Sequence, residues 1–577
     1  MASRTIIEHF RDLRGISPIR ATAETIFNEV HNGRTIHKPS MADLYDLARN
    51  CPGVTITDLS VSSEAIREFG LPPGARVLNH NHGRIVGRSA SARHFYTRLP
   101  ENRKSLLEGV AREVAWELSA MDLYTADVVC GLDPGLMVRA RMITPAENAI
   151  NLYNWCLNFM PMQQASSAYE SSTPLEIPDI LVVSHPEWKD DLNRPEFQNG
   201  AVIVDYGCNT IFILGLRYFG EHKKGTLTLA WSSGMSLGRV ACHGGIKEVD
   251  FSSCASPYRA LGKRTISFFG LSGSGKSSHT NSLSNDSTLP ENVHVTIAHD
   301  DAFQVDCENL RCTVWEPSLF DKTDQRDLLH PDWNHVISTQ NQLVLDTAHG
   351  RVPVGLDLRN SNGRAIFSRS MLGNCCDSTG FPDHVNWLMK DSTLPPIMRL
   401  ENTDLAVAMG ATLMTKRSSA ENVSAQEMTK LVFEPFANPF RVYELFRDCR
   451  GFRKVFETGA KCHVFNSGGF WKASDSELTK IPLSLSLKLQ TAILTDSIQW
   501  EPWKLLPGAL IPTIDSIERV WPGYSDHFVH SAISNHEEYL ILLNDRIRQR
   551  VAFLETELSD CPDELKRLVD ALSRSLM

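Results

Sequence analysis

The chain has 577 residues, 42% hydrophobic and 22% charged, which is the composition of an ordinary globular protein. This length exceeds what one hydrophobic core usually supports, so we expect two domains with a cleft between them. The net charge of -10 argues against general binding to nucleic acid, and the lack of a run of about eighteen apolar residues argues against a membrane span.

The first 50 residues are predicted to be helical, with Ile6, Phe10 and Leu13 at helical spacing. From residue 124 onward, short apolar runs alternate with turns, which predicts a mixed sheet. Its expected strands are 126–130, 136–143, 180–183, 201–204 and 211–214. The polar segment 246–264 then suggests a linker or a surface excursion, and we expect a domain boundary near it.

The second half opens with a buried strand at 265–269, a glycine-rich turn and a helix that begins at Lys276. Another buried strand at 293–298 leads to Asp300 and Asp301. Segments 536–550 and 563–576 have helical periodicity and many charges, so we interpret them as a solvated helical tail.

The thirteen cysteines are scattered and odd in number, which favours free thiols in a reducing compartment over a disulfide framework. The N-terminal segment lacks the apolar stretch of a secretory signal. We therefore expect a cytoplasmic protein. The sequence leaves its oligomeric state open.

The glycine-rich turn matches the phosphate-binding loop pattern of Gly, four residues, Gly, Lys, and Ser or Thr. Backbone N–H groups and the helix N-terminus would face phosphate oxygens, Lys276 would reach the terminal phosphates, and Ser277 could ligate Mg²⁺. The predicted nucleotide-binding residues here are Gly270, Leu271, Ser272, Gly273, Ser274, Gly275, Lys276, Ser277 and Ser278. Asp301 lies where such enzymes place a carboxylate that holds the metal or its water.

These features occur within a chain that, from about residue 80 to 495, resembles the ATP-dependent phosphoenolpyruvate carboxykinase family. The matching segments are Gly87-Arg88-Ser89, Cys130-Gly131, 141–144, Tyr218-Phe219-Gly220-Glu221-His222-Lys223-Lys224-Gly225, the glycine-rich loop, His299-Asp300-Asp301, 316–323, and Leu394-Pro395-Pro396 with Arg399. GTP-using relatives typically carry Cys at the position of Ser274, so the resemblance favours ATP.

The resemblance implies an α/β fold of two domains with the active site in the cleft between them. Residues 1–238 would form the substrate-binding domain and residues 239–577 the nucleotide- and metal-binding domain. ATP and Mg²⁺ would be accompanied by Mn²⁺, held by Lys224, His243 and Asp301. A lysine ligates only when neutral, which requires a lowered pKa.

The resemblance also implies which groups act on oxaloacetate. Arg88, Tyr218 and Arg364 would hold the carboxylates of oxaloacetate or phosphoenolpyruvate, because the guanidinium fork suits a carboxylate. Lys223 or Lys224 would stabilise the enolate left when CO₂ departs, and Lys276 would neutralise charge on the transferred phosphoryl group. Arg364 and these three lysines form the predicted catalytic set. Lys480 and Ser486 stand near the family's adenine site.

The chain departs from the family where 302–305 replaces Glu-His-Gly-Trp with Ala-Phe-Gln-Val, and where 244–247 becomes Gly-Gly-Ile-Lys. Changes beside metal ligands commonly weaken activity by about ten- to a hundredfold without changing the reaction. Three hypotheses follow: an ATP-dependent carboxykinase acting on oxaloacetate, a kinase of the same fold for another small carboxylate or hydroxyl compound, and a nucleotide-binding regulator with little catalysis.

Overall fold

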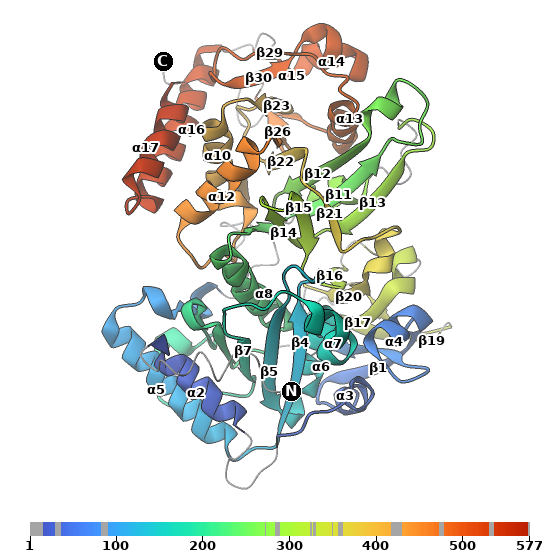
Figure 1. The fold of residues 1–577 in the computed structure, drawn as a ribbon, viewed down its shortest axis with the longest axis vertical. Coiled ribbons are helices and arrows are strands. Elements are labelled where there is room, and N and C mark those ends of the chain that lie inside the picture. The colour runs from blue at the N-terminus through green and yellow to red at the C-terminus, as the bar shows by residue number, and fades with distance from the viewer. Residues whose placement is uncertain are drawn as a thin grey trace.

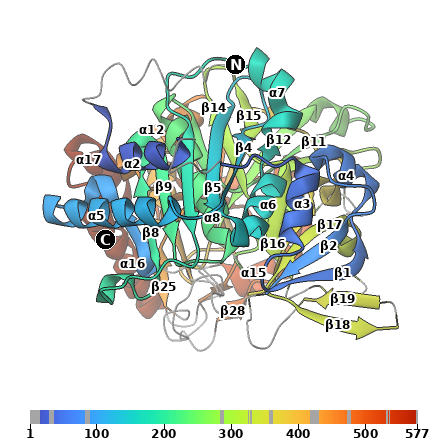
Figure 2. The ribbon, with the colours of Figure 1, turned by 90° about the horizontal axis from the view of Figure 1, so that it is seen from below.

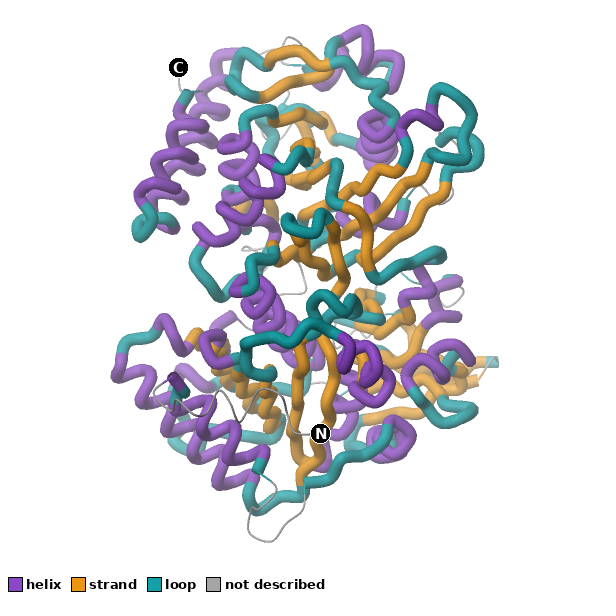
Figure 3. Tube along the Cα trace, viewed as in Figure 1, coloured by secondary structure: helices purple, strands orange, loops and turns teal. Residues whose placement is uncertain are grey.

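The computed structural model has a mixed α/β architecture with several sheets, as expected (Figures 1 and 3). It describes residues 15–28, 36–81, 90–271, 273–282, 289–323, 326, 330–348, 350–355, 362–416, 430–471, 478–529, 533 and 536–574. Within these ranges, no helix combines the length and the apolar character needed to cross a membrane.

A seven-stranded mixed sheet forms the lower part of the molecule in Figure 1. In sheet order, its strands are β3 (Arg93–Phe95), β8 (Ala201–Asp205), β9 (Thr210–Leu214), β7 (Ile180–His185), β5 (Val138–Pro145), β4 (Leu123–Cys130) and β6 (Met160–Pro161). The five strands predicted from 126 to 214 are thus present. Strands β7, β8 and β9 are buried at every position, which explains why each is a continuous apolar run rather than an alternating one.

Helices cover both faces of this sheet. Leu181, Val183 and Phe212 face one hydrophobic cluster together with α2 (Pro18–Phe27) and α5 (Glu101–Leu118). The alternate strand residues face a second cluster, which includes α3 (Met41–Ala48), α6 (Ala149–Asn158) and α8 (Phe219–Ser236). The sheet is therefore the middle of three layers, and Figure 2 shows α2 and α5 together against it.

A five-stranded sheet joins segments that are far apart in the chain. In order it contains β1 (Val54–Ser60), β2 (Arg76–His80), β17 (Val336–Gln340), β20 (Arg364–Ser368) and β16 (Ser318–Lys322). Beside β1, Figure 2 shows the projecting hairpin of β18 (Leu343–Thr347) and β19 (Gly350–Val354). Three strands of the second half therefore share a sheet with two strands of the first, joined through the parallel pairing of β17 with β2.

An eight-stranded sheet dominates the upper part of Figure 1. Its order is β13 (His294–His299), β11 (Gly245–Asp250), β12 (Lys263–Phe269), β22 (His384–Met389), β26 (Lys461–Asn466), β23 (Ile397–Leu400), β30 (Ala509–Pro512) and β29 (Trp500–Pro502). Next to it, a four-stranded sheet contains β10 (Val240–His243), β14 (Ala302–Asp306), β15 (Arg311–Val314) and β21 (Ser378–Gly380).

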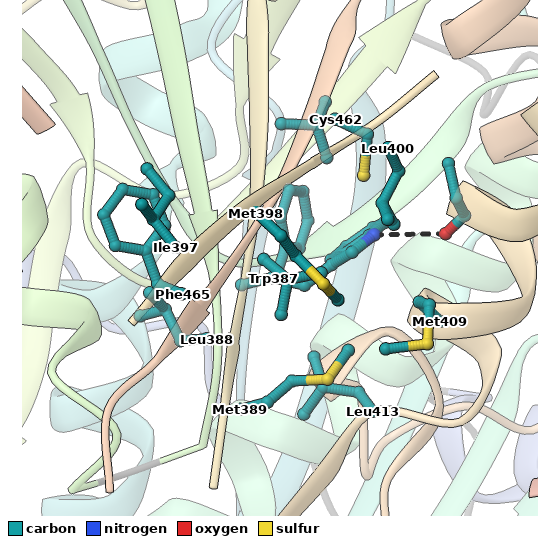
Figure 4. Packing of buried hydrophobic residues seen from close by; sticks show 14 of the residues in the cluster. Trp387, Leu388, Met389, Ile397, Met398, Leu400, Met409, Leu413, Cys462 and Phe465 are labelled. Atoms are coloured by element: carbon teal, nitrogen blue, oxygen red, sulfur yellow. Dashed lines mark hydrogen bonds between the residues drawn. The ribbon is translucent and has the colours of Figure 1, made fainter. Parts of the chain in front are cut away.

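The largest hydrophobic cluster lies around the eight-stranded sheet. Figure 4 shows Trp387, Met398 and Cys462 on one side of the strands and Leu388 and Phe465 on the other. The Trp387 indole donates to the carbonyl of Ala406, 3.2 Å away, and thereby ties α10 (Thr403–Ala411) to the sheet. The remaining elements are α4 (Ser63–Phe69), α7 (Met162–Ser171), α9 (Lys276–Asn281), α12 (Leu445–Glu457), α13 (Leu483–Leu494), α14 (Ile514–Val520), α15 (Tyr524–Phe528), α16 (His536–Glu557), α17 (Pro562–Ser573), and the strand pairs β24 (Met414–Lys416) with β25 (Leu431–Phe433) and β27 (Gly469–Phe470) with β28 (Thr479–Lys480).

Two expectations from the sequence are wrong. The segment 246–264 is not simply a linker, because β11 and the start of β12 lie within it and pair in the eight-stranded sheet. The C-terminal helices are not a solvated tail either. Arg550 in α16 is buried and forms an ion pair with buried Asp391 at 2.9 Å, and apolar residues of α16 and α17 belong to the main core.

All thirteen cysteines lie within the described residues and are free thiols, as predicted. Most are buried and act as small apolar side chains in the cores.

Candidate active site

A pocket of about 170 Å³ lies where α8, α9, the end of β13, and the strands β16 and β20 come together. The predicted site residues that line it are Tyr218, Lys224, His243, Leu271, Lys276, Ser277, Asp301 and Arg364. Its other lining residues are Gly220, Asn281, Asp300, Leu319, Phe320, Asp321, Met371, Pro439 and Phe440. The fold thus gathers into one cavity side chains that are up to 222 residues apart in the sequence, from Tyr218 to Phe440.

The glycine-rich loop connects β12 directly to α9, which begins at Lys276 as predicted. Gly273 and Gly275 have φ of 82° and 93°, a conformation in which any other residue would be strained. The Ser274 hydroxyl donates to the carbonyl of Leu271 at 2.7 Å and closes the turn from within. The loop therefore has a fixed curvature at the N-terminus of α9.

Another glycine, Gly245, lets α9 lie close to the sheet. A Cβ atom on Gly245 of β11 would stand 1.9 Å from the Thr280 hydroxyl oxygen, so only glycine permits this approach. Lys247, two residues further along β11 and fully buried, donates to the carbonyl of Ser282 at 2.9 Å. An ammonium group at a helix C-terminus is electrostatically favourable, so β11 also stabilises the end of α9.

Asp301, just after β13, is the charged centre of the pocket. Its Oδ2 accepts from Lys223 at 2.9 Å and from Lys224 at 2.6 Å, and its Oδ1 lies 3.4 Å from the Lys276 ammonium. Burial alone would raise the pKa of this carboxyl, but the three lysines hold it well below its usual range. Asp301 is therefore an anion at neutral pH.

The adjacent lysines of α8 differ in charge state. Lys223 is fully buried, but Asp301 and Glu316, whose Oε1 is 3.3 Å away, outweigh the desolvation and raise its pKa. Burial and the neighbouring Lys223 charge lower the pKa of Lys224 to about 7, in spite of Asp301. Lys223 is thus a permanent cation, whereas Lys224 reaches the neutral state easily.

His243, at the end of β10, presents a lone pair to Asp301. Its Nδ1 lies 2.6 Å from the carbonyl of Ala437, which only a protonated nitrogen can approach so closely. Burial, and then the charge of Lys276, lower the pKa of His243 to about 4, so the ring is neutral at pH 7. Its Nε2 therefore has no proton and stands 3.2 Å from Asp301 Oδ1.

This arrangement fits a divalent cation. Two acceptors, the His243 Nε2 and the Asp301 carboxylate, face one another beside an amine that is readily neutral. Such a donor set is stabilised when a metal ion lies between its members. Among the described residues no cluster of three or more His, Cys, Asp or Glu side chains is placed to bind a metal, so the lysine is needed to complete the set.

A second group of oxygens surrounds Ser277. Asp300 is half-buried, its Oδ1 is shielded from solvent and has no hydrogen-bond partner, and desolvation raises its pKa to about 6 although Lys276 and the Ser277 hydroxyl act against this. An orphaned carboxylate oxygen beside a hydroxyl at the start of α9 fits the hard oxygen ligands that Mg²⁺ prefers.

Arg364 and Tyr218, which also line the pocket, can provide groups for an anionic ligand. Arg364 begins β20 and is 9% exposed. Its Nε donates to Asn362 Oδ1 at 2.9 Å, and its guanidinium lies over the Phe320 ring at 5.7 Å. The guanidinium is thus held in place at its Nε in a residue that lines the cavity.

Other predicted residues lie elsewhere. Lys480 in β28 is exposed and Ser486 in α13 is buried, and neither lines the pocket. Gly270, Gly273, Ser274, Gly275 and Ser278 shape the loop and α9 without lining the cavity. Arg88 and Ser272 lie outside the described residues.

Comparison with known proteins identifies the family. A family model described as phosphoenolpyruvate carboxykinase, of the ATP type, matches residues 100–513, most of the chain. The chain belongs to this carboxykinase family. The resemblance seen in the sequence motifs is thereby confirmed.

Individual carboxykinases match at low identity, and each of the following is named phosphoenolpyruvate carboxykinase (ATP). The protein from Methylobacterium sp. is 31% identical over 162 residues, 28% of this chain and 26% of its own length. That from Aeropyrum pernix is 24% identical over 334 residues, 54% of this chain and 61% of its own. That from Novosphingobium aromaticivorans is 23% identical over 403 residues, 65% of this chain and 67% of its own. The chain is therefore a diverged member of this family, and it spans less than two thirds of the length of the first two of these relatives.

Three features of this carboxykinase site escaped prediction. The Ala437 carbonyl orients His243, and both Phe436 and Ala437 adopt positive φ, 52° and 54°, to present it. Phe440 packs 4.7 Å from the Lys224 ammonium and edge-on to His243, which excludes water from both. Asp321 adds a carboxylate to the wall and pairs with Arg326 at 2.9 Å. The Ala437 carbonyl and Phe440 carry no sequence signal, because they act through backbone shape and packing.

Proposed function

We propose that the protein catalyses the ATP-dependent decarboxylation and phosphorylation of oxaloacetate to phosphoenolpyruvate, CO₂ and ADP. The observation that carries this proposal is the convergence of Lys223, Lys224, His243 and Lys276 on Asp301, in the pocket that also contains Arg364. Family membership supports the same reaction.

In the proposed architecture, residues 1–238 form the substrate-binding domain and residues 239–577 the nucleotide-binding domain, with the pocket as the cleft between them. The Gly270 to Ser277 loop would surround the ATP phosphates, with Lys276 on the terminal ones. Lys480 and Ser486 stay predictions for the adenine end. The free thiols fit a reducing, cytoplasmic environment.

The substrate carboxylates would be held by Arg364 and Tyr218, joined by Arg88. Arg364 is suited to this because its guanidinium is fixed by Asn362 before any ligand binds. Holding the carboxylate beside the keto group would leave the other carboxylate free to depart as CO₂, so that breaking its C–C bond leaves the electron pair on the enolate.

Lys224, His243 and Asp301 would hold the transition metal, usually Mn²⁺ in the family, and Ser277 with Asp300 would hold the Mg²⁺ of ATP. Metal ions in these places would act as Lewis acids toward the enolate and phosphoryl oxygens. Lys223, cationic and buried, stabilises the developing enolate charge by preorganised electrostatics. The enolate oxygen then attacks the γ-phosphorus in line, ADP leaves, and Lys276 neutralises the charge on the transferred group.

A second candidate, phosphorylation of a different small carboxylate or hydroxyl compound, is favoured by one observation. Asp321 and its neighbours Leu319 and Phe320 form a wall whose residues contact the cavity. The altered segment 302–305, in contrast, is buried in β14 between β10 and β15 and does not line the pocket. The carboxylate that Asp321 adds to this wall would therefore bear on which acceptor binds.

The proposal is tested by phosphoenolpyruvate formation from oxaloacetate with ATP, Mg²⁺ and Mn²⁺, comparing wild type with Lys224→Met. The variant should lose about a hundredfold or more in kcat, because a proposed ligand of the transition metal is removed. Lys454→Met, at a half-exposed lysine on α12, is the matched control and should keep full activity. Equal rates for wild type and Lys224→Met would contradict the assignment, and ATP turnover without phosphoenolpyruvate would favour the second candidate.

A further inference from the structure

A second pocket, of about 70 Å³, lies in the eight-stranded sheet away from the active site. Its polar lining comes from His384, Arg399, Lys461, His463, Asp496 and Trp500. Strands β12, β22 and β26 are parallel, and His384 and Lys461 are the first residues of β22 and β26. The glycine-rich loop instead follows the last residue of β12. The two pockets therefore lie at opposite ends of these parallel strands.

The strand register brings the basic side chains of this pocket onto one face. His384 pairs with Lys461 across β22 and β26, and His463 pairs with Arg399 across β26 and β23. Residues opposite one another share a face, and positions two apart do so as well. This is the face of Leu388 and Phe465 in Figure 4, whereas Cys462 points to the other side.

Both histidines are buried with unsatisfied nitrogens. His384 is 1% exposed, and neither of its ring nitrogens has a hydrogen-bond partner. His463 is 2% exposed, and its Nδ1 has none. The rings stack on one another with centroids 5.4 Å apart, but this stacking gives no hydrogen bond to the ring nitrogens. Unpaired buried polar atoms are costly, so such a pair indicates a ligand with hydrogen-bonding oxygens.

The charges around the pocket favour an anion. Asp496 is already paired with Arg264 at 3.2 Å and with Lys461 at 3.6 Å. Arg399 donates to Glu401 at 2.6 Å, and its guanidinium lies over the Trp500 ring at 5.5 Å. Three cationic side chains thus stand near two carboxylates. The cations are Arg264, Lys461 and Arg399, and the carboxylates are Asp496 and Glu401. Consistent with this positive field, the pKa of His384 is lowered to about 3 by burial and then by Lys461 and Arg264.

We propose that this pocket is a second binding site for a small oxyanion, with the chemistry of a phosphate group. Arg399 and Lys461 supply charge-assisted donors, and the neutral imidazoles of His384 and His463 supply an N–H each. A water needs about 10–15 Å³, so the cavity has room for a group of several heavy atoms. The surplus of cations excludes a metal ion.

The test is calorimetric titration of the full-length protein with inorganic phosphate. Wild type is compared with Lys276→Ala, which weakens the proposed nucleotide site, and with Lys276→Ala combined with Arg399→Gln. We expect one phosphate to bind to Lys276→Ala protein, and the added Arg399→Gln to weaken that binding at least about tenfold, because a charge-assisted bond is lost. Combining Lys276→Ala with Arg399→Lys instead should retain part of the affinity. Arg351→Gln in the same background, at a half-exposed arginine on β19, is the control and should change nothing.

The outcomes separate this site from the active site. Phosphate binding that is abolished by Lys276→Ala alone, or that is unchanged by the added Arg399→Gln, would overturn the proposal whether or not the protein is a carboxykinase. A parallel titration with glycerol 3-phosphate distinguishes the source of the group: binding of both compounds indicates the phosphoryl end of a larger metabolite, and binding of phosphate alone indicates the free ion.

Discussion

Among individual residues, Asp301 carries the charge on which Lys223, Lys224 and Lys276 converge. Lys276 and Asp301 are predictable from spacing alone, because a phosphate loop and a following strand that ends in aspartate form a known combination. Lys224 and His243 needed the family resemblance, since an isolated lysine or histidine carries no signal. The Ala437 carbonyl could not be predicted, because its contact with His243 depends on two residues with positive φ.

Glu316 is proposed as a positioning residue for Lys223. It is completely buried, accepts from Asn158, and lies 3.3 Å from the Lys223 ammonium. Glu316→Gln keeps the shape but removes the negative charge, so Lys223 should shift toward Asp301 and align less well with the enolate. We expect kcat to fall about tenfold or more with KM for ATP and the melting temperature little changed.

Steady-state kinetics with both substrates measures kcat and KM separately. Glu308→Gln, at an exposed glutamate, is the control. Loss of stability without a fall in kcat per folded molecule would show that Glu316 serves only to hold the fold.

Among the elements, α9 and the loop before it are predictable in position but not in packing. The pattern correctly places the helix start at Lys276. It does not reveal that α9 packs on β11 at Gly245. That strand runs into the segment 246–264, which the sequence suggested was a linker. Likewise, α16 was correctly predicted as helical, but the buried Arg550–Asp391 pair that anchors it reverses the expectation of a solvated tail.

Gly245→Ala should weaken ATP binding. Its Cβ would collide with Thr280 and push α9 and the glycine-rich loop away from the sheet, so we expect affinity for ATP to fall severalfold or more. Gly109→Ala in α5, where the added methyl group meets open space, should have no effect. Adding Thr280→Ala to Gly245→Ala should restore part of the affinity. Calorimetric titration with ATP measures all of these, and an unchanged affinity in Gly245→Ala would refute the packing argument.

Asp448 in α12 should make stability dependent on pH. It is 1% exposed, and burial raises its pKa from 3.8 to about 7, although Arg441 and the Tyr443 hydroxyl act against this. The folded protein therefore keeps a proton that the unfolded chain loses near pH 4. The contribution of this group to stability is largest below pH 4 and falls, by at most about 4 kcal/mol, as pH rises to 7.

Asp448→Asn should remove this part of the pH dependence. Urea denaturation at pH 5 and pH 8 measures it, because the wild type should lose more stability between these values than the variant. The same loss in both proteins would show that Asp448 is ionised in the fold.

At the scale of the whole molecule, the mixed α/β class and the strands of the first half follow from the sequence, because buried strands are continuous apolar runs. The joining of β16, β17 and β20 to β1 and β2 in one sheet does not, because it rests on the pairing of β17 with β2, which are more than 250 residues apart. This long-range pairing brings Arg364 and the β16 wall to face α8, and so creates the pocket.

The identity of the phosphorylated product is the most direct test of the proposed conversion of oxaloacetate to phosphoenolpyruvate. Wild-type protein is incubated with oxaloacetate, ATP, Mg²⁺ and Mn²⁺, and the phosphorus-containing products are followed by ³¹P nuclear magnetic resonance. The account predicts that phosphoenolpyruvate and ADP appear in equal amounts and that neither exceeds the background when oxaloacetate is omitted. ADP accompanied only by inorganic phosphate, or no turnover by folded protein that binds ATP, would contradict it.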